Sequence, residues 1–210
     1  MLRKDKSSID WLEFMQSLQS IAQTGISYAK DVYDKERYQE ILNLVSGKYS
    51  QITGAKLTAV KATLFNEVGY ATPKICVRAL CLKDEKVLLV KEREEGLWSL
   101  PGGWADINLS PAESLLKEIR EETGFSARVT RMLSLWDKRM HEHPAHWPHT
   151  YLAFYHCHIT GGSLKTSYEI SDIQFFDVDD LPELSTHRVT KKQIQTLVTM
   201  VNDNLVASFD

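Results

Sequence analysis

The chain has 210 residues and a formal net charge of −3, and 43% of its residues are hydrophobic and 25% are charged. These values are ordinary for a globular protein with a buried core, and the length allows one large domain or an ordinary domain with a small appendage. The slight negative charge gives no reason to expect tight binding to nucleic acid or anionic membranes, and no apolar run reaches the ~18 residues of a membrane span.

The three cysteines, Cys76, Cys81 and Cys157, are widely spaced and lie in apolar segments. An odd number of cysteines in such segments does not indicate a disulfide framework, so we expect buried, reduced thiols. The segment MLRKDKSSIDWLEF at the start of the chain lacks a continuous apolar signal region. From these two features we expect a cytoplasmic protein with no membrane partner.

Residues 1–71 differ from the rest of the chain because their apolar residues recur at helical spacing. Asp10 is the expected N-cap of the first helix. The apolar face of the first helix consists of Trp11, Phe14, Met15, Leu18, Ile21 and Ala22. The apolar face of the second helix, which ends near Gly54, consists of Tyr38, Ile41, Leu42, Val45, Tyr49 and Ile52. A third helix carries Leu57, Val60, Leu64 and Phe65.

Three helices of this size bury little apolar surface by themselves, so we expect them to pack on the rest of the chain or on a second subunit. Glycine and proline punctuate residues 69–73. We therefore predict a small all-helical N-terminal domain over residues 1–71 and a second domain over residues 72–210. Basic and acidic residues nearly balance in the helical domain, which favours dimerisation or docking over DNA binding.

Strand patterns begin after residue 73. Residues 75–82 and 87–90 are short apolar runs joined by a polar segment, which is the pattern of a hairpin. Further strands are predicted at residues 127–136, 150–159 and 172–178, and an amphipathic closing helix at residues 191–204. Strands mixed with helices predict the α/β class, with a sheet sandwiched between helices.

Residues 101–125 read PGGWADINLSPAESLLKEIREETGF and place Glu118, Glu121 and Glu122 on one face of a predicted helix. Three close carboxylates repel one another unless a cation neutralises them, and such hard oxygen ligands suit Mg²⁺ or Mn²⁺. The Gly102-Gly103 pair ahead of the helix supplies a tight backbone turn. The alternative is a solvated acidic surface, although such surfaces usually interleave lysine or arginine with their acids.

This segment resembles the signature of the Nudix hydrolases, which reads Gly, five residues, Glu, seven residues, Arg-Glu, an aliphatic, any residue, Glu-Glu, any residue, Gly and an aliphatic. Gly103 opens the match and residues 117–125 close it at the right spacing. Two positions depart from it, because Leu109 replaces the first Glu and Lys117 replaces the Arg. Glu113 lies four residues before Lys117 and is the predicted partner that holds it. The alternative is that the two departures reflect a gradual loss of the signature residues in this chain.

The resemblance implies an α/β/α sandwich with a mixed sheet. It also implies that Glu118, Glu121 and Glu122 hold the metal together with the carbonyl of Gly102. The helical region resembles the N-terminal extension of a Nudix subgroup that acts on nucleoside diphosphates linked to another group and forms dimers through it. We therefore expect a homodimer through the N-terminal helices.

Other positions are candidates around the metal. Family members often carry a general base in a loop outside the signature, and Glu169 lies just before the strand predicted at residues 172–178; a plain surface acid is an equally good interpretation. Asp106 is interpreted as a supporting residue behind the ligands or as a turn former. Trp104 is a candidate for stacking on a base or a choline-like cation, whereas Trp98 is expected to brace the turn.

Residues 139–149 contain four of the seven histidines. Their spacing fits no standard structural zinc pattern. A substrate-facing loop is favoured over zinc, with Arg139 binding phosphate and Trp147 stacking on a base, and a solvated loop without function is the alternative.

These features together predict metal-dependent hydrolysis of the pyrophosphate bond of a nucleoside diphosphate linked to another group, of the ADP-ribose or CDP-choline type. The products would be a nucleoside monophosphate and a phosphorylated second group. Two alternatives remain. One is a non-catalytic nucleotide sensor, which the missing first Glu favours. The other is a hydrolase of nucleoside triphosphates or RNA ends, and the absence of a basic channel makes RNA the poorer substrate.

Overall fold

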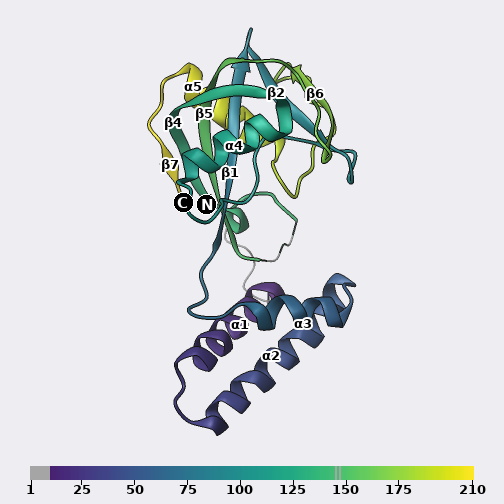
Figure 1. The fold of residues 1–210 in the computed structure, drawn as a ribbon, viewed down its shortest axis with the longest axis vertical. Coiled ribbons are helices and arrows are strands. Elements are labelled where there is room, and N and C mark those ends of the chain that lie inside the picture. Colours follow the sequence, from purple (N-terminus) through teal and green to yellow (C-terminus); the bar gives the residue numbers. More distant parts are fainter. Residues whose placement is uncertain (1–9, 145, 147) are drawn as a thin grey trace. The chain divides into compact units, whose positions relative to one another are not determined.

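The computed structural model describes residues 10–144, 146 and 148–210, so Trp147 lies outside the described residues. The chain divides into two compact units, Met1–Thr72 and Pro73–Asp210. The first unit is helical and the second is built around a sheet (Figure 1). None of the helices in the described part of the chain has the length and apolar character needed to cross a membrane.

The first unit consists of α1 (Trp11–Tyr28), α2 (Val32–Thr53) and α3 (Leu57–Asn66). Asp10 caps α1 as predicted, because its carboxylate accepts hydrogen bonds from the backbone N–H groups of Leu12 and Glu13. Asp31 caps α2 in the same way. Gly54 ends α2 in the left-handed conformation, with φ of 71°, which a glycine adopts without strain.

The predicted apolar faces of the helical unit are only partly buried. Met15 and Ala22 of α1 pack inside the unit, but Trp11, Phe14 and Ile21 from the same predicted face are 47–57% exposed. The remaining buried apolar side chains of the unit are Leu42, Val45, Tyr49 and Leu64. The unit therefore keeps a considerable apolar surface of its own in contact with solvent.

The second unit contains a mixed sheet. Its strands are β1 (Lys74–Lys83), β2 (Lys86–Glu92), β3 (Trp98–Ser99), β4 (Phe125–Asp137), β5 (Thr150–Gly162), β6 (Ile170–Phe176) and β7 (Ser208–Phe209). The strand order is β3-β2-β1-β5-β4-β7, and β6 pairs with β2. β1 runs parallel to β5 and antiparallel to β2. β3 and β7 were not predicted, because two residues are too few to show an alternating pattern.

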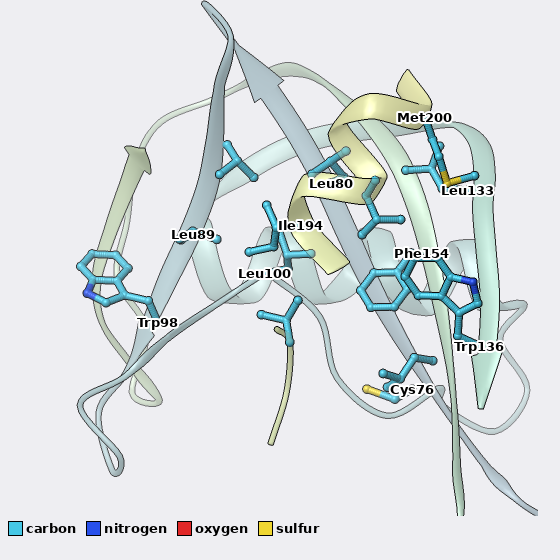
Figure 2. Close-up of a cluster of buried hydrophobic side chains, with 14 residues drawn as sticks. Cys76, Leu80, Leu89, Trp98, Leu100, Leu133, Trp136, Phe154, Ile194 and Met200 are labelled. Carbon is cyan, nitrogen blue, oxygen red and sulfur yellow. The ribbon is translucent and has the colours of Figure 1, made fainter. Parts of the chain in front are cut away.

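Two helices cover the two faces of this sheet (Figure 1). Leu115 and Ile119 of α4 (Pro111–Thr123) pack on one face. On the other face, α5 (Lys191–Asn202) packs through Ile194, and Figure 2 shows the cluster around this side chain. The α/β class and the sheet between helices are therefore confirmed. The closing helix ends at Asn202, two residues earlier than predicted.

The turn before α4 is anchored along β1. Val77 donates its backbone N–H to the Gly103 carbonyl at 2.8 Å, and Ala79 donates to the Pro101 carbonyl at the same distance. Gly102, between these two contacts, has φ of 134°, and a Cβ on it would collide with the Val77 carbonyl. Only glycine therefore fits here.

Phe154 is the largest side chain that is fully buried in the core between the sheet and α5, and its ring centroid lies 5.4 Å from that of Trp136. Phe154→Ala should lower the free energy of unfolding by roughly 3–5 kcal/mol, because it removes apolar contacts and leaves a cavity. Urea denaturation would measure the loss. Tyr168→Ala is the control, since Tyr168 is 92% exposed; an equal loss in both variants would contradict this account.

Candidate active site

Local signals in the sequence begin and end α4 at fixed residues. Ser110 and Glu113 form a reciprocal capping box, in which the Ser110 hydroxyl accepts from the Glu113 N–H and the Glu113 carboxylate accepts from the Ser110 N–H. Pro111 occupies the first turn, and Gly124 ends the helix with φ of 75°. These caps fix which residues of α4 face the Gly102-Gly103 turn.

The predicted pairing of Glu113 with Lys117 is wrong. The Glu113 carboxylate is occupied by both the N–H and the hydroxyl of Ser110. Lys117 instead pairs with Asp106, with Nζ 2.7 Å from Oδ2. The capping box satisfies backbone donors at the helix start that would otherwise lack a partner. The Glu113 carboxylate is engaged in these bonds and therefore does not pair with Lys117. Asp106 therefore ties the turn to α4 through Lys117. Its backbone N–H also donates to the Ser114 hydroxyl oxygen of α4 at 2.6 Å.

The three signature glutamates of α4 differ in their surroundings. Glu122 is 6% exposed, and its Oε2 accepts a hydrogen bond from the Gly102 N–H at 2.8 Å. Glu118 is half-buried and lies against Gly103, where an added Cβ would come within 2.5 Å of its Oε1. Glu121 is exposed. Two of the three carboxylates thus converge on the glycine turn.

Burial raises the pKa of Glu122 to about 8, although the nearby Arg78 and the Gly102 N–H oppose the shift. Burial also raises the pKa of Glu118. Within the described residues, no three His, Cys, Asp or Glu side chains are already placed to hold a metal ion. The residues fit such an ion in their chemistry, because the buried Glu122 and half-buried Glu118 carboxylates beside a backbone turn gain most from a hard divalent cation.

Arg78 is a residue at this site that the sequence analysis missed. It lies on β1, is 3% exposed, and donates from Nη1 to the carbonyls of Leu100, at 3.0 Å, and of Gly102. Its charge lies close enough to Glu122 to oppose the rise in the pKa of that carboxyl. One cation therefore holds the glycine turn and partly compensates the buried acid. The available signal was a charged residue inside the apolar run Ile75-Cys76-Val77-Arg78-Ala79.

Glu92 and Arg188 were also missed. Glu92 ends β2, is 7% exposed, and its Oε1 lies 3.2 Å from Nη1 of Arg188. Burial raises the pKa of Glu92, whereas the charges of Arg188 and Arg78 oppose the shift. Glu92, Arg78 and Glu122 therefore form a continuous series of buried charges through the second unit. Their positions in the chain are far apart, so no local pattern links them.

Glu169 lies in an exposed loop that Arg93 holds in place. The Arg93 N–H donates to the Glu169 carbonyl at 2.7 Å, and the Arg93 guanidinium donates to the Tyr168 and Ile170 carbonyls. The Glu169 carboxylate is near Glu92, whose pKa it helps to raise. Within the described part of the chain, no hydrogen bond joins Glu169 to a signature glutamate. The loop is therefore anchored at the edge of the site.

Trp104 and Arg139, the described candidates for substrate binding, have different contacts. Trp104 is 49% exposed beside the glycine turn, where its backbone pairs with Cys76. Trp98 is buried and packs edge-on against Phe176, with ring centroids 4.8 Å apart, so it belongs to the core. Arg139 contacts Asp137, with Nη2 2.7 Å from Oδ2. Trp104 is thus the described candidate closest to the turn.

The histidines of residues 139–149 bind separate partners. His141 lies 3.2 Å from the Asp210 carboxylate, and His149 lies 3.1 Å from that of Asp137. His143 is 2.7 Å from the Thr186 carbonyl through Nδ1. This segment is therefore tied to several neighbouring elements of the second unit.

Two family models match this chain. A model described as a UDP-X-like, N-terminal oligomerisation domain matches residues 9–64, and a model described as the NUDIX domain matches residues 72–197. The Bacillus subtilis (strain 168) protein YjhB, whose naming as an ADP-ribose pyrophosphatase is provisional, is 39% identical over 91% of this chain and 92% of its own length. An ADP-ribose pyrophosphatase of Methanocaldococcus jannaschii is 30% identical over 69% of this chain and 82% of its own.

Two solved structures resemble the chain at similar levels. The crystal structure of a UDP-X diphosphatase has a TM-score of 0.61 and 36% identity, and the match covers 95% of this chain and 97% of that one. An ADP-ribose pyrophosphatase from Streptococcus suis also has a TM-score of 0.61, with 33% identity over 66% of this chain and 100% of its own. The first of these matches extends through both units.

The half-buried His143 predicts a pH dependence of stability. Burial lowers its pKa from 6.5 to about 4, and the charge of Lys138 adds to this effect while the Thr186 carbonyl opposes it. The unfolded chain then binds more protons between these values, so stability is present above pH 6.5 and is lost as the pH falls toward 4. His143→Gln should show a smaller loss in urea denaturation across this range. The exposed His158→Gln should keep the original dependence; identical curves for His143→Gln and the unaltered protein would refute the assignment.

Proposed function

The chain belongs to the Nudix hydrolase family, and we propose that it hydrolyses the pyrophosphate bond of a nucleoside diphosphate linked to a second group, of the ADP-ribose or CDP-choline class. The products are a nucleoside monophosphate and the phosphorylated second group. Relatives described as ADP-ribose pyrophosphatases and as a UDP-X diphosphatase support this substrate class. Every one of those substrates contains the same P–O–P bridge.

We assign Mg²⁺ or Mn²⁺ to Glu118, Glu121 and Glu122, with the Gly102 carbonyl as a backbone ligand. The observation that carries this assignment is the buried Glu122 carboxylate, which accepts the Gly102 N–H and whose ionised form is disfavoured by burial. A divalent cation supplies the missing compensation, neutralises phosphate oxygens and makes a water more acidic. Burial of the acids thus favours cation binding over an empty solvated surface.

The surrounding residues position this site. Arg78 fixes the carbonyls of Leu100 and Gly102 and so sets the shape of the glycine turn. The Lys117–Asp106 pair ties the turn to α4 and takes the supporting role that the signature's first Glu and Arg have in the family. Glu169 is the candidate proton acceptor, carried by a loop that Arg93 anchors through three carbonyl contacts.

We also propose that the protein forms a homodimer through its N-terminal helices. Trp11, Phe14 and Ile21 leave an apolar strip of α1 exposed within the helical unit. A stable monomer seldom exposes so many large apolar side chains on a small helical unit, and a second copy would bury them. The description of the matching model as an oligomerisation domain supports this arrangement.

Glu122→Gln tests the metal and substrate assignment. The amide still accepts the Gly102 N–H, so the fold should persist, but the loss of a charged ligand should lower turnover by about 10²-fold or more. The measurement is phosphatase-coupled release of phosphate from ADP-ribose, CDP-choline, UDP-glucose, NADH and dGTP with Mg²⁺ or Mn²⁺. Glu94→Gln, at an exposed position of the same unit, is the matched control.

Each result of this assay decides between functions. Turnover of dGTP alone would favour the triphosphate hydrolase. If a nucleotide binds measurably but none of the assayed nucleotides is hydrolysed, the result would favour the non-catalytic nucleotide sensor. Near-normal turnover by Glu122→Gln would remove Glu122 from the ligand set.

The dimer is tested by substituting charge into the exposed strip of α1. Phe14→Glu combined with Ile21→Glu should give a monomer in light scattering after gel filtration, because charged side chains cannot be buried unpaired in an interface. Ile107→Glu is the control, since Ile107 is 88% exposed and belongs to the second unit. A double variant that keeps its helical circular dichroism and the mass of a dimer would contradict the proposal.

A further inference from the structure

Lys138 is a buried cation that has no role in the proposed reaction as described above. It is the first residue of the short 3₁₀ helix η1 (Lys138–Met140) that follows β4, and it is 6% exposed. Within the residues that the structure describes, its ammonium group has no hydrogen bond and no ion pair. An unpaired buried ammonium is costly, so its presence calls for a partner that binds from outside the chain.

The charged groups around Lys138 are cations rather than acids. Burial, together with the positive charges of Arg78 and Arg188, lowers the pKa of Lys138 to about 8. Of the acids beside the two arginines, Glu92 is paired with Arg188, and Glu122 lies near Arg78. Three cations therefore gather from β1, η1 and the segment before α5, and no carboxylate of the described residues pairs with Lys138.

Two of these cations also have unused hydrogen-bond donors. The Nε atoms of Arg78 and Arg188 are buried and have no acceptor among the described residues. The side chain of Arg188 is 33% exposed, so the cluster reaches solvent through it. With the Lys138 ammonium, three positively charged groups close to one another therefore have N–H donors that lack an acceptor. An oxyanion with several acceptor oxygens would satisfy them together.

The position of the cluster relates it to the signature glutamates. Gly102 donates its N–H to Glu122 and accepts a hydrogen bond at its carbonyl from Arg78. One residue of the turn therefore joins the acidic surface of α4 to the cation cluster. These two neighbouring environments suit a substrate with two linked phosphates. A metal ion held by the acids would bind one phosphate, and the fixed cations would bind the other.

We propose that Lys138, Arg78 and Arg188 form an anion subsite that binds one phosphate group of the substrate. The general claim is phosphate binding at Lys138, and its extension to a nucleoside diphosphate linked to a second group rests on the proposed function. Lys138 provides a compact charge, and the two guanidinium groups provide directed N–H donors. The subsite lies on the carbonyl side of Gly102, next to the residues assigned to the metal.

Binding of inorganic phosphate to the full-length protein, followed by isothermal titration calorimetry without metal, tests the subsite. Lys138→Met keeps most of the side-chain volume and removes the charge, and it should weaken phosphate binding about tenfold or more. Lys138→Arg restores a cation and should restore most of the affinity. Lys165→Met, at an exposed position in the same unit, should bind phosphate like the unaltered protein.

Thermal unfolding supplies a second readout that a merely structural lysine would not give. Without phosphate, Lys138→Met should melt at the same or a higher temperature, because it removes an unpaired buried charge. Phosphate should raise the melting temperature of the unaltered protein and of Lys138→Arg, and it should leave that of Lys138→Met unchanged. A lysine that only supports the fold would instead make Lys138→Met less stable with no change in the response to phosphate.

The outcomes separate the subsite from the proposed reaction. Equal phosphate affinity in Lys138→Met and the unaltered protein, or no phosphate binding by the unaltered protein, would overturn the subsite even if the enzyme hydrolyses its substrate. If the unaltered protein hydrolyses no nucleotide but loses phosphate binding on Lys138→Met, the subsite stands and the proposed reaction falls. If both hold, Lys138→Met should raise KM for the hydrolysed nucleotide about tenfold.

Discussion

The second unit depends on the conformation of one residue, Gly102. Its φ of 134° and the close approach of the Val77 carbonyl exclude any side chain at this position. In return, its N–H reaches Glu122 on α4 and its carbonyl reaches Arg78 on β1. The N–H and the carbonyl of this one residue thus contact both the acidic helix and the sheet.

The buried charges around this bend do not favour stability. Glu122, Glu92 and Lys138 are each nearly inaccessible to solvent. Burial raises the pKa of the two acids and lowers that of the lysine, so it favours the neutral form of each group. A core of apolar residues would be more stable at the same positions. Such groups are typical of sites that bind charged ligands, and here the proposed ligands are of both signs, a divalent cation beside the acids and a phosphate beside the bases.

The two units differ in how completely they bury their apolar side chains. The sheet unit covers both of its faces with α4 and α5 and encloses a continuous core on each side. The helical unit has only three helices, and large side chains such as Trp11 and Leu44 remain exposed. A unit of this size has too little interior for all of its apolar residues. Its excess apolar surface is the physical basis for the proposed dimer.

The sequence by itself determined the features that depend on neighbours along the chain. Helical spacing placed Glu118, Glu121 and Glu122 on one helix, and Asp10 and Gly54 marked helix ends, because caps and periodicity act within a few residues. Alternation located the long strands but not the two-residue β3 and β7.

Only the tertiary structure decided which charges meet. Lys117 pairs with Asp106 rather than with Glu113, because the capping box had already taken the Glu113 carboxylate and the glycine turn brings Asp106 to the helix. Arg78, Glu92 and Arg188 come from three distant segments and were therefore missed. Contacts across the sheet depend on strand order and register, which no local pattern of residues encodes.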